Sequence, residues 1–377
     1  MTRPFSANRL WDVVVRPVRK GFQPDTTSAL DTAARWWRTS AAGVVEEIAY
    51  DDLAAGLTRA CRDGIAFVLP TTSSRSAEEI AGYARGLIEQ LRAASERRPA
   101  MPLVLIVGVQ WLADVDEDEA VSRVTTVLAP WAARAAPVHV IGVALRGPYK
   151  VRTLRAAIAL TLDADLCGLG WVDDDVRLGE ACLARLIDDF VARPAPCVVG
   201  ATKIPHERTE AASRWLFRVK EVMQPATNYP HGCCMLVDRS LLQRGIPPRY
   251  RCDDGYFCFE VLRRTPRTSE HLVLVPGATC DYLVGADRGR FVGKLKRVLL
   301  NHVVFLADYP PAVGLRYLRE MLYPGFWPLA RWDGRGGVRV AAARWVLQAI
   351  HLSCLVATAM GLGIRGVLGR PLREIRF

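Results

Sequence analysis

The chain has 377 residues, of which 50% are hydrophobic, and a formal net charge of +11. This composition excludes an intrinsically disordered chain and supplies enough apolar surface for one large core or two modest ones. The excess positive charge predicts an anionic partner: a phosphate-bearing substrate, an anionic lipid or nucleic acid.

The first 60 residues carry helical patterning with arginines and tryptophans interspersed, and Ser28 is an N-cap candidate within this stretch. We therefore expect a helical extension over residues 1–60. The first twenty residues contain no uncharged apolar stretch of signal-peptide length, so we do not expect export. The ten cysteines form no CxxC pair and no zinc-ligand pattern, which favours reduced thiols and a cytoplasmic location.

From residue 61 onward, short apolar strands alternate with amphipathic helices. The strand predictions are residues 65–70, 102–109, 137–145, 166–172, 196–202 and 271–277. Continuous apolar strands that alternate with helices are typical of a parallel sheet covered on both faces. We therefore expect an α/β fold with a Rossmann-like, mostly parallel sheet over residues 61–290, with the functional groups at the carboxyl ends of its strands.

Three consecutive carboxylates, Asp173, Asp174 and Asp175, follow the strand at 166–172. At the carboxyl edge of a sheet, such residues can hold a divalent cation together with substrate phosphates, and the cation relieves their mutual repulsion. The alternative is a solvated acidic turn in which one aspartate caps the following helix. A second DxD pattern, Asp163 and Asp165, precedes the strand, so we expect it at the opposite edge.

Five segments in order resemble the family 2 inverting glycosyltransferases with the GT-A fold, over about residues 64–290. They are FVLPTTSSR, GPYKVRTLRAAIAL, LCGLGWVDDDV, HGCCMLVDRSLL and RCDDGYFCFEVLRR. The resemblance implies transfer of a single sugar from a nucleotide-sugar donor to an acceptor hydroxyl, with inversion. It also implies Mn²⁺ or Mg²⁺ bound by Asp173 and Asp175. The donor side would be formed by Pro70, Thr71, Thr72, Lys150, Asp173 and Asp174.

On the acceptor side, the resemblance implies that Asp254 is the base and Asp253 its neighbour. A helix N-terminus lowers the pKa of Asp254, but we expect the adjacent charge and desolvation to raise it. The alternative is that either aspartate only caps the helix that begins here. The acceptor wall would include His231, Gly232 and Cys233, where glycine suits a close approach of backbone to a ligand.

The sequence also departs from the family pattern. The second strand ends without the acidic or amide residue that reads the nucleobase, and Gln110 and Asp114 are the substitutes at hand. Arg155 stands about where the family has an asparagine after the helix lysine. The late tryptophan motif of processive members is also missing, which favours addition of a single sugar.

Residues 291–377 form a third region with amphipathic and apolar helical patterning. Residues 346–364 contain no formal charge, and this uncharged stretch is just long enough to span a bilayer. However, Gln348, His351 and Ser353 interrupt the stretch and arginines flank both ends. We therefore expect helices that lie on the cytosolic face of an anionic membrane, which favours a lipid-linked acceptor. The alternative is a buried helix packed on the catalytic domain or on a second subunit.

Two other function classes stay open at this point. Nucleotidyltransferases share a doubly wound sheet with carboxylate-bound metal, but their glycine-rich phosphate loop is replaced here by PTTSSR. A non-catalytic basic protein that binds a membrane or nucleic acid is supported by the net charge alone. We expect no nucleic-acid partner.

Overall fold

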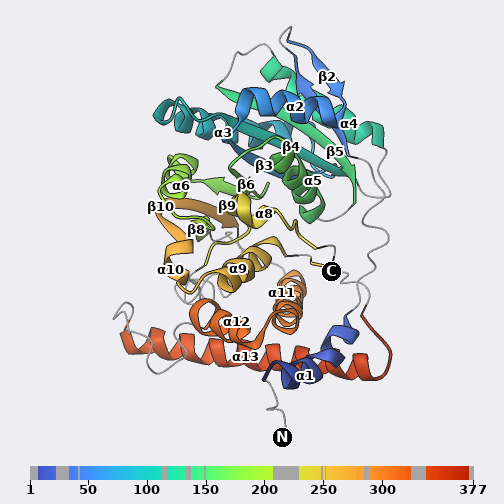
Figure 1. Cartoon of the computed structure of the whole chain (residues 1–377), viewed down its shortest axis with the longest axis vertical. Helices are drawn as coiled ribbons and strands as arrows, with labels where there is room; N and C mark the ends of the chain where they lie inside the picture. The colour runs from blue at the N-terminus through green and yellow to red at the C-terminus, as the bar shows by residue number, and fades with distance from the viewer. Residues whose placement is uncertain are drawn as a thin grey trace, which may run out of the picture.

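The computed structural model describes residues 7–22, 34–40, 43–111, 117–132, 137–147, 150–206, 229–247, 249–250, 252–283, 288–323 and 337–372. A mixed sheet runs through the upper part of the molecule in Figure 1. Within the described ranges it has ten strands, in the order β2-β1-β5-β4-β3-β6-β9-β8-β10-β7. The bounds of these strands are β1 Arg35–Thr39, β2 Val45–Ile48, β3 Ile65–Thr72, β4 Leu103–Trp111, β5 Val138–Arg146, β6 Gly168–Val172, β7 Val176–Leu178, β8 Val198–His206, β9 Cys234–Asp238 and β10 Leu272–Leu283.

The α/β class is confirmed, and the sheet is mixed. The centre, β5-β4-β3-β6, is parallel throughout, and β8 pairs in parallel with β10. The strand β9 runs antiparallel to both β6 and β8, and the edge strands β1, β2 and β7 also pair antiparallel. Since β9 is reversed, its amino end lies at the same sheet edge as the carboxyl ends of β3 and β6.

Helices cover both faces of this sheet, as the apolar strands predicted. Along β3, Ala66 and Val68 belong to the core shared with α2 (Tyr50–Cys61) and α5 (Lys150–Asp163). The alternate residues Ile65, Phe67 and Leu69 belong to the core on the opposite face. That face is covered by α3 (Ala77–Arg97), α4 (Glu117–Ala132) and α6 (Cys182–Val191). Burial on both faces explains why the strands carry no polar alternation.

The helical extension expected over residues 1–60 is wrong in its middle part. The helices α1 (Ala7–Gly21) and α2 form, but β1 and β2 between them make a hairpin that extends the sheet beyond β5. Trp36 and Trp37 are both buried, and successive side chains of a strand point to opposite faces, so each indole enters a different core. Pairing with the edge of β5 outweighs the helical tendency of the surrounding alanines. Ser28 lies outside the described residues.

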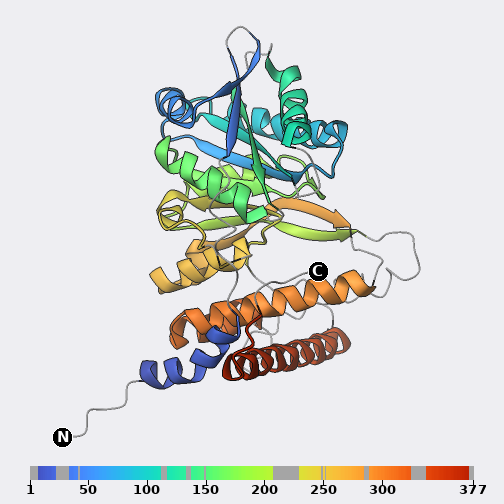
Figure 2. The ribbon, with the colours of Figure 1, turned by 90° about the vertical axis from the view of Figure 1, so that its right-hand side faces the viewer.

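A second, helical layer packs beneath the sheet in Figures 1 and 2. Its elements are α11 (Arg288–Asp308), α12 (Pro311–Arg316), the π-helix Tyr317–Leu322, α13 (Gly337–Val367) and α1. The aromatic ring of Phe259 on α9 (Asp253–Arg264) joins the two layers, since it lies 5.3 Å from the ring of Phe305 and 4.2 Å from that of Tyr317. The short helices α8 (Arg239–Leu242) and α10 (Thr268–His271) flank α9. The helical layer therefore supports the element that begins with Asp253 and Asp254.

Candidate active site around Lys150

The carboxyl edge of the central strands brings the sequence-predicted residues together. The strands β3 and β6 end at Thr72 and Val172, and the residues before β9 reach the same edge. The helices α5 and α9 begin there, with Lys150 and Asp253 as their first residues. The edge therefore collects parts of all five segments that carry the resemblance.

The ammonium group of Lys150 joins the two acidic segments. Its Nζ lies 2.9 Å from Asp173 Oδ1, 2.9 Å from Asp253 Oδ2 and 2.8 Å from the carbonyl oxygen of Gly232. The two acidic segments therefore lie at one location. Burial lowers the pKa of Lys150, but the two carboxylates outweigh it and hold the pKa above its ordinary value, so the ammonium is charged.

Asp253 is the more deeply buried carboxylate of its pair, with 7% of its side chain exposed. Burial raises its pKa to about 6, because Lys150 offsets only part of the desolvation and the charge of Asp254 adds to it. A carboxyl with this pKa changes charge near neutrality and can accept a proton at physiological pH.

Asp254 behaves in the opposite way, and the expectation of a raised pKa is wrong for this residue. Burial disfavours its ionised form, but hydrogen bonds to the carboxylate outweigh the burial and lower its pKa. The Cys252 thiol donates to Oδ1 at 2.7 Å, the Gly255 N–H donates to Oδ1 at 2.7 Å, and the Gly232 N–H donates to Oδ2 at 3.0 Å. Both carboxylate oxygens of Asp254 thus accept hydrogen bonds, which stabilise its ionised form.

The three aspartates after β6 have three different environments. Asp173 contacts Lys150, whereas Asp174 Oδ2 accepts a hydrogen bond from the buried Thr71 hydroxyl at 2.6 Å and lies 3.4 Å from Arg75 Nε. Asp175 is exposed to solvent. The N-cap of the following helix is Ala181, without a side-chain hydrogen bond, so none of the three caps it. Arg75 was missed by the sequence reasoning, although it closes the TTSSR segment.

Gly232 is required by the geometry of the site. A Cβ at this position would lie 2.8 Å from Asp253 Oδ2, closer than real Cβ contacts allow. Its carbonyl oxygen also accepts from the Trp171 indole N–H at 2.9 Å. The sequence predicted a close approach of a ligand here, and the neighbour that the structure describes is the carboxylate of Asp253.

The remaining candidates line the same edge in supporting positions. His231 is half-buried, with its ring 4.8 Å from that of Tyr229. Cys233 points into the core, where its Sγ lies 3.5 Å from Cys280 Sγ, and its carbonyl oxygen accepts from the Asp173 N–H. Pro70 is buried within β3, and the hydroxyls of Thr72 and Ser74 are 2.5 Å apart. Cys233 therefore contributes its backbone to the edge.

The structure places Gln110 and Arg155, two residues at positions where the sequence departs from the family pattern. Gln110 is buried at the end of β4, and its carbonyl oxygen accepts from the Ser73 N–H. Arg155 donates to the carbonyl oxygens of Ile246 and Pro247 at 2.8 Å each, so it braces the chain after α8. Asp114 lies outside the described residues. Asp163, from the second DxD pattern, is the last residue of α5, at the opposite edge from Lys150, as expected.

The predicted metal ligands at this edge are the two carboxylates Asp173 and Asp175. In the described ranges, no group of three or more His, Cys, Asp and Glu side chains is arranged to hold a metal ion. Mg²⁺ commonly takes one or two protein carboxylates and completes its shell with phosphate oxygens and water. Of the two predicted ligands, Asp173 has 28% of its side chain exposed and contacts Lys150, and Asp175 is exposed.

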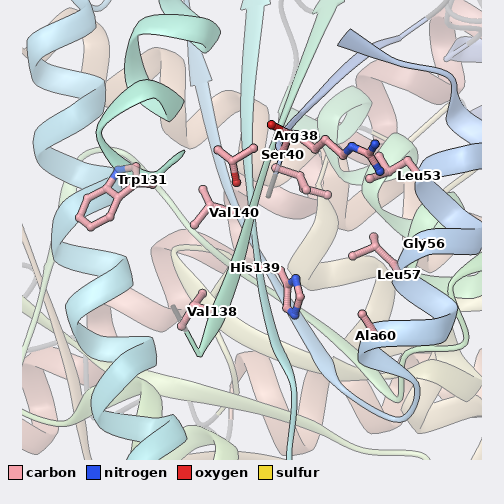
Figure 3. A pocket seen from close by; sticks show the side chains of 12 residues that line it. Arg38, Ser40, Leu53, Gly56, Leu57, Ala60, Trp131, Val138, His139 and Val140 are labelled. Atoms are coloured by element: carbon pink, nitrogen blue, oxygen red, sulfur yellow. The ribbon is translucent and has the colours of Figure 1, made fainter. Parts of the chain in front are cut away.

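A cavity of about 410 Å³ lies elsewhere, at the stretch of β5 that extends beyond its pairing with β1. It is lined by α2, the last residues of β1, the start of β5 and Trp131 of α4. In Figure 3, His139 points toward α2, whereas Val138 and Val140 point toward Trp131. No residue of the two acidic segments lines this cavity.

Comparisons with known proteins add no assignment. Neither a scan against protein-family models nor a search of curated proteins gives a match.

Proposed function

We propose that the protein is an inverting glycosyltransferase that moves a single sugar from a nucleotide-sugar donor to an acceptor hydroxyl. The observation that carries the proposal is the meeting of two acidic segments across Lys150 at the carboxyl edge of β3 and β6. Sugar transfer needs a stabilised diphosphate leaving group and a deprotonated acceptor hydroxyl. One acidic segment serves each need, and their proximity lets both act on one anomeric carbon.

The donor side consists of the segment after β6 and its neighbours. Asp173 and Asp175 would hold Mn²⁺ or Mg²⁺, which supplies charge stabilisation for the departing nucleoside diphosphate. Asp174 is fixed by Thr71 and Arg75, so it can receive a hydroxyl of the donor without losing its orientation. Five carboxylates against the cations Lys150, Arg75 and Lys203 leave excess negative charge, and a dianionic diphosphate requires a further cation here.

The acceptor side consists of Asp253 and Asp254, with the proton carried by Asp253. A base works best when its pKa lies near the operating pH, and the value of about 6 for Asp253 meets this condition. Asp254, held ionised by the donors Cys252, Gly232 and Gly255, fixes the start of α9 and raises the pKa of its neighbour. The base assignment thus moves from Asp254 to Asp253.

The test is release of nucleoside diphosphate from a panel of nucleotide sugars, with Mn²⁺ and a lipid extract as the source of acceptors. We expect release with one donor and loss of turnover in Asp253→Asn, with donor binding retained. Asp163→Asn is the matched control, because Asp163 ends the same helix that Lys150 begins. Release of pyrophosphate in place of nucleoside diphosphate would indicate a nucleotidyltransferase, and absence of any release would refute the proposal.

A further inference from the structure

Most of the large exposed hydrophobic side chains in the described part of the chain lie on α1 and α13. Val13 and Val14 of α1 are 61% and 59% exposed. On α13 the exposed apolar residues include Trp345, Val346, Ile350, Met360, Ile364 and Val367. Figures 1 and 2 place both helices at the end of the molecule remote from the β1–β2 hairpin. We call this exposed apolar surface the α1–α13 face.

The helix α13 has an inner side packed on the protein and an exposed outer side. Its inner side buries Gln348, Leu355 and Leu362, and His351 Nδ1 lies 2.7 Å from the Tyr323 hydroxyl. Its outer side carries exposed apolar side chains between Trp345 and Val367, with the exposed Ser353 among them. Residues 345–364 contain no charged side chain, whereas the outer side of a helix in water is normally polar. The outer side is therefore suited to an apolar medium.

Packing against α1 keeps α13 on the body of the protein. A Cβ on Gly366 would lie 1.8 Å from the carbonyl oxygen of Pro17, and one on Gly21 would lie 1.9 Å from that of Leu362. The Leu372 N–H donates to the Gly21 carbonyl oxygen at 2.8 Å. By length and composition alone, Trp345–Val367 could cross a bilayer. A helix docked along its inner side offers only its outer side to lipid, which is the arrangement of an interfacial helix.

Positive charge borders the face where the two helices meet. On α1, Arg16 and Lys20 are exposed and follow Val13 by three and seven positions, on the same side of the helix. At the end of α13, Arg365 and Arg370 are exposed. The sequence of α13 contains no acidic residue. We propose that the α1–α13 face docks on an anionic lipid bilayer, with α13 lying in the interface plane and these cations against the headgroups.

Vesicle flotation of the full chain tests this docking without reference to any catalytic activity. The vesicles are phosphatidylcholine alone and phosphatidylcholine mixed with phosphatidylglycerol. We expect binding to the mixed vesicles, weakened by salt, and a roughly tenfold loss in Ile350→Ser/Met360→Ser. Because this variant removes only exposed side chains, it should fold. Val44→Ser is the matched control, since Val44 is 58% exposed near the β1–β2 hairpin and should bind as the wild type does.

Charge reversal provides a second variant that leaves the apolar side chains in place. Arg16→Glu/Lys20→Glu should weaken binding to the mixed vesicles by roughly 30-fold or more, because each cation near an anionic surface contributes separately. Failure of the wild type to bind, or equal binding of all variants, would overturn the docking. Retention on membranes after alkaline carbonate extraction would overturn the interfacial arrangement in favour of a span. A dimer in light scattering that Ile350→Ser/Met360→Ser dissociates would assign the face to a second copy of the chain.

Discussion

Replacing Lys150 by methionine removes the cation that joins the two acidic segments while keeping most of the side-chain volume. In the wild type, the pKa of Asp253 is about 6, against an ordinary value of 3.8. A carboxyl whose pKa is raised by folding stabilises the folded state below its ordinary pKa, and this contribution is lost as the pH rises through the folded value. The difference corresponds to about 3 kcal/mol between acidic and neutral pH. In Lys150→Met, the pKa of Asp253 rises further, because an attractive charge is gone.

The variant should therefore be destabilised more at neutral pH than in acid. Breaking a buried ion pair costs about 3–5 kcal/mol. The Lys150 and Asp173 side chains are 25% and 28% exposed. We therefore expect a cost at the lower end of this range, about 3 kcal/mol, at pH values above the wild-type pKa of Asp253. Below that pH, Asp253 is protonated in the variant and no longer carries the buried charge that Lys150 neutralises in the wild type. The cost then falls to about 1–2 kcal/mol for the hydrogen bonds that Lys150 makes.

Urea unfolding on both sides of the wild-type pKa measures this difference. Lys203→Met is the control, since it removes a half-buried ammonium that lies 4.1 Å over the ring of Tyr282 and should give a similar cost under both conditions. Equal destabilisation of Lys150→Met under both conditions, or a larger one in acid, would refute the reasoning that Lys150 governs the ionisation of Asp253.

Three further results follow from the same site. Below a pH of about 6, the rate of nucleoside diphosphate release should fall as the pH is lowered, because Asp253 must be ionised to accept a proton. A rate that is the same below and above this pH would exclude Asp253 as the base. Gly232→Ala should cost about 1–3 kcal/mol in thermal unfolding because its Cβ overlaps the carboxylate of Asp253. Gly82→Ala, on α3 with no atom within 4 Å of the new Cβ, should instead be neutral or stabilising, and equal effects would contradict the crowding. Thr71→Val should weaken donor binding in equilibrium dialysis by roughly tenfold, because Asp174 loses its 2.6 Å hydrogen bond; unchanged binding would remove Asp174 from the donor side.

The sequence predicted the centre of the sheet and the location of its acidic edge. The apolar runs before Thr71 and Asp173 indicated buried strands, because each is short and bounded by turn residues. The edge elements could not be read in the same way. The strand with Trp36 and Trp37 lies in an alanine-rich context with helical patterning, and its strand form depends on pairing with β5, a contact distant in sequence.

The identities of the site residues were also easier to predict than their protonation. The order of the segments predicted that Asp173 and Asp253 lie close together, but the pKa of each carboxylate also depends on contacts from other segments. Gly232 donates to Asp254 and Lys150 contacts Asp253, while the Cys252 thiol, two residues before Asp254, adds a local donor. The contacts of Gly232 and Lys150 are made by tertiary packing and have no local pattern in the sequence, so the expected direction of the Asp254 pKa was wrong.

Thermal unfolding with UDP, GDP, CDP and dTDP, each with and without Mn²⁺, tests most directly whether the carboxyl end of β6 holds a nucleoside diphosphate through a cation. The proposed site predicts that one nucleotide raises Tm with Mn²⁺ and not without it, and that Asp173→Asn/Asp175→Asn abolishes the rise. No rise with any nucleotide, or a rise that survives both the removal of Mn²⁺ and the double substitution, would contradict it.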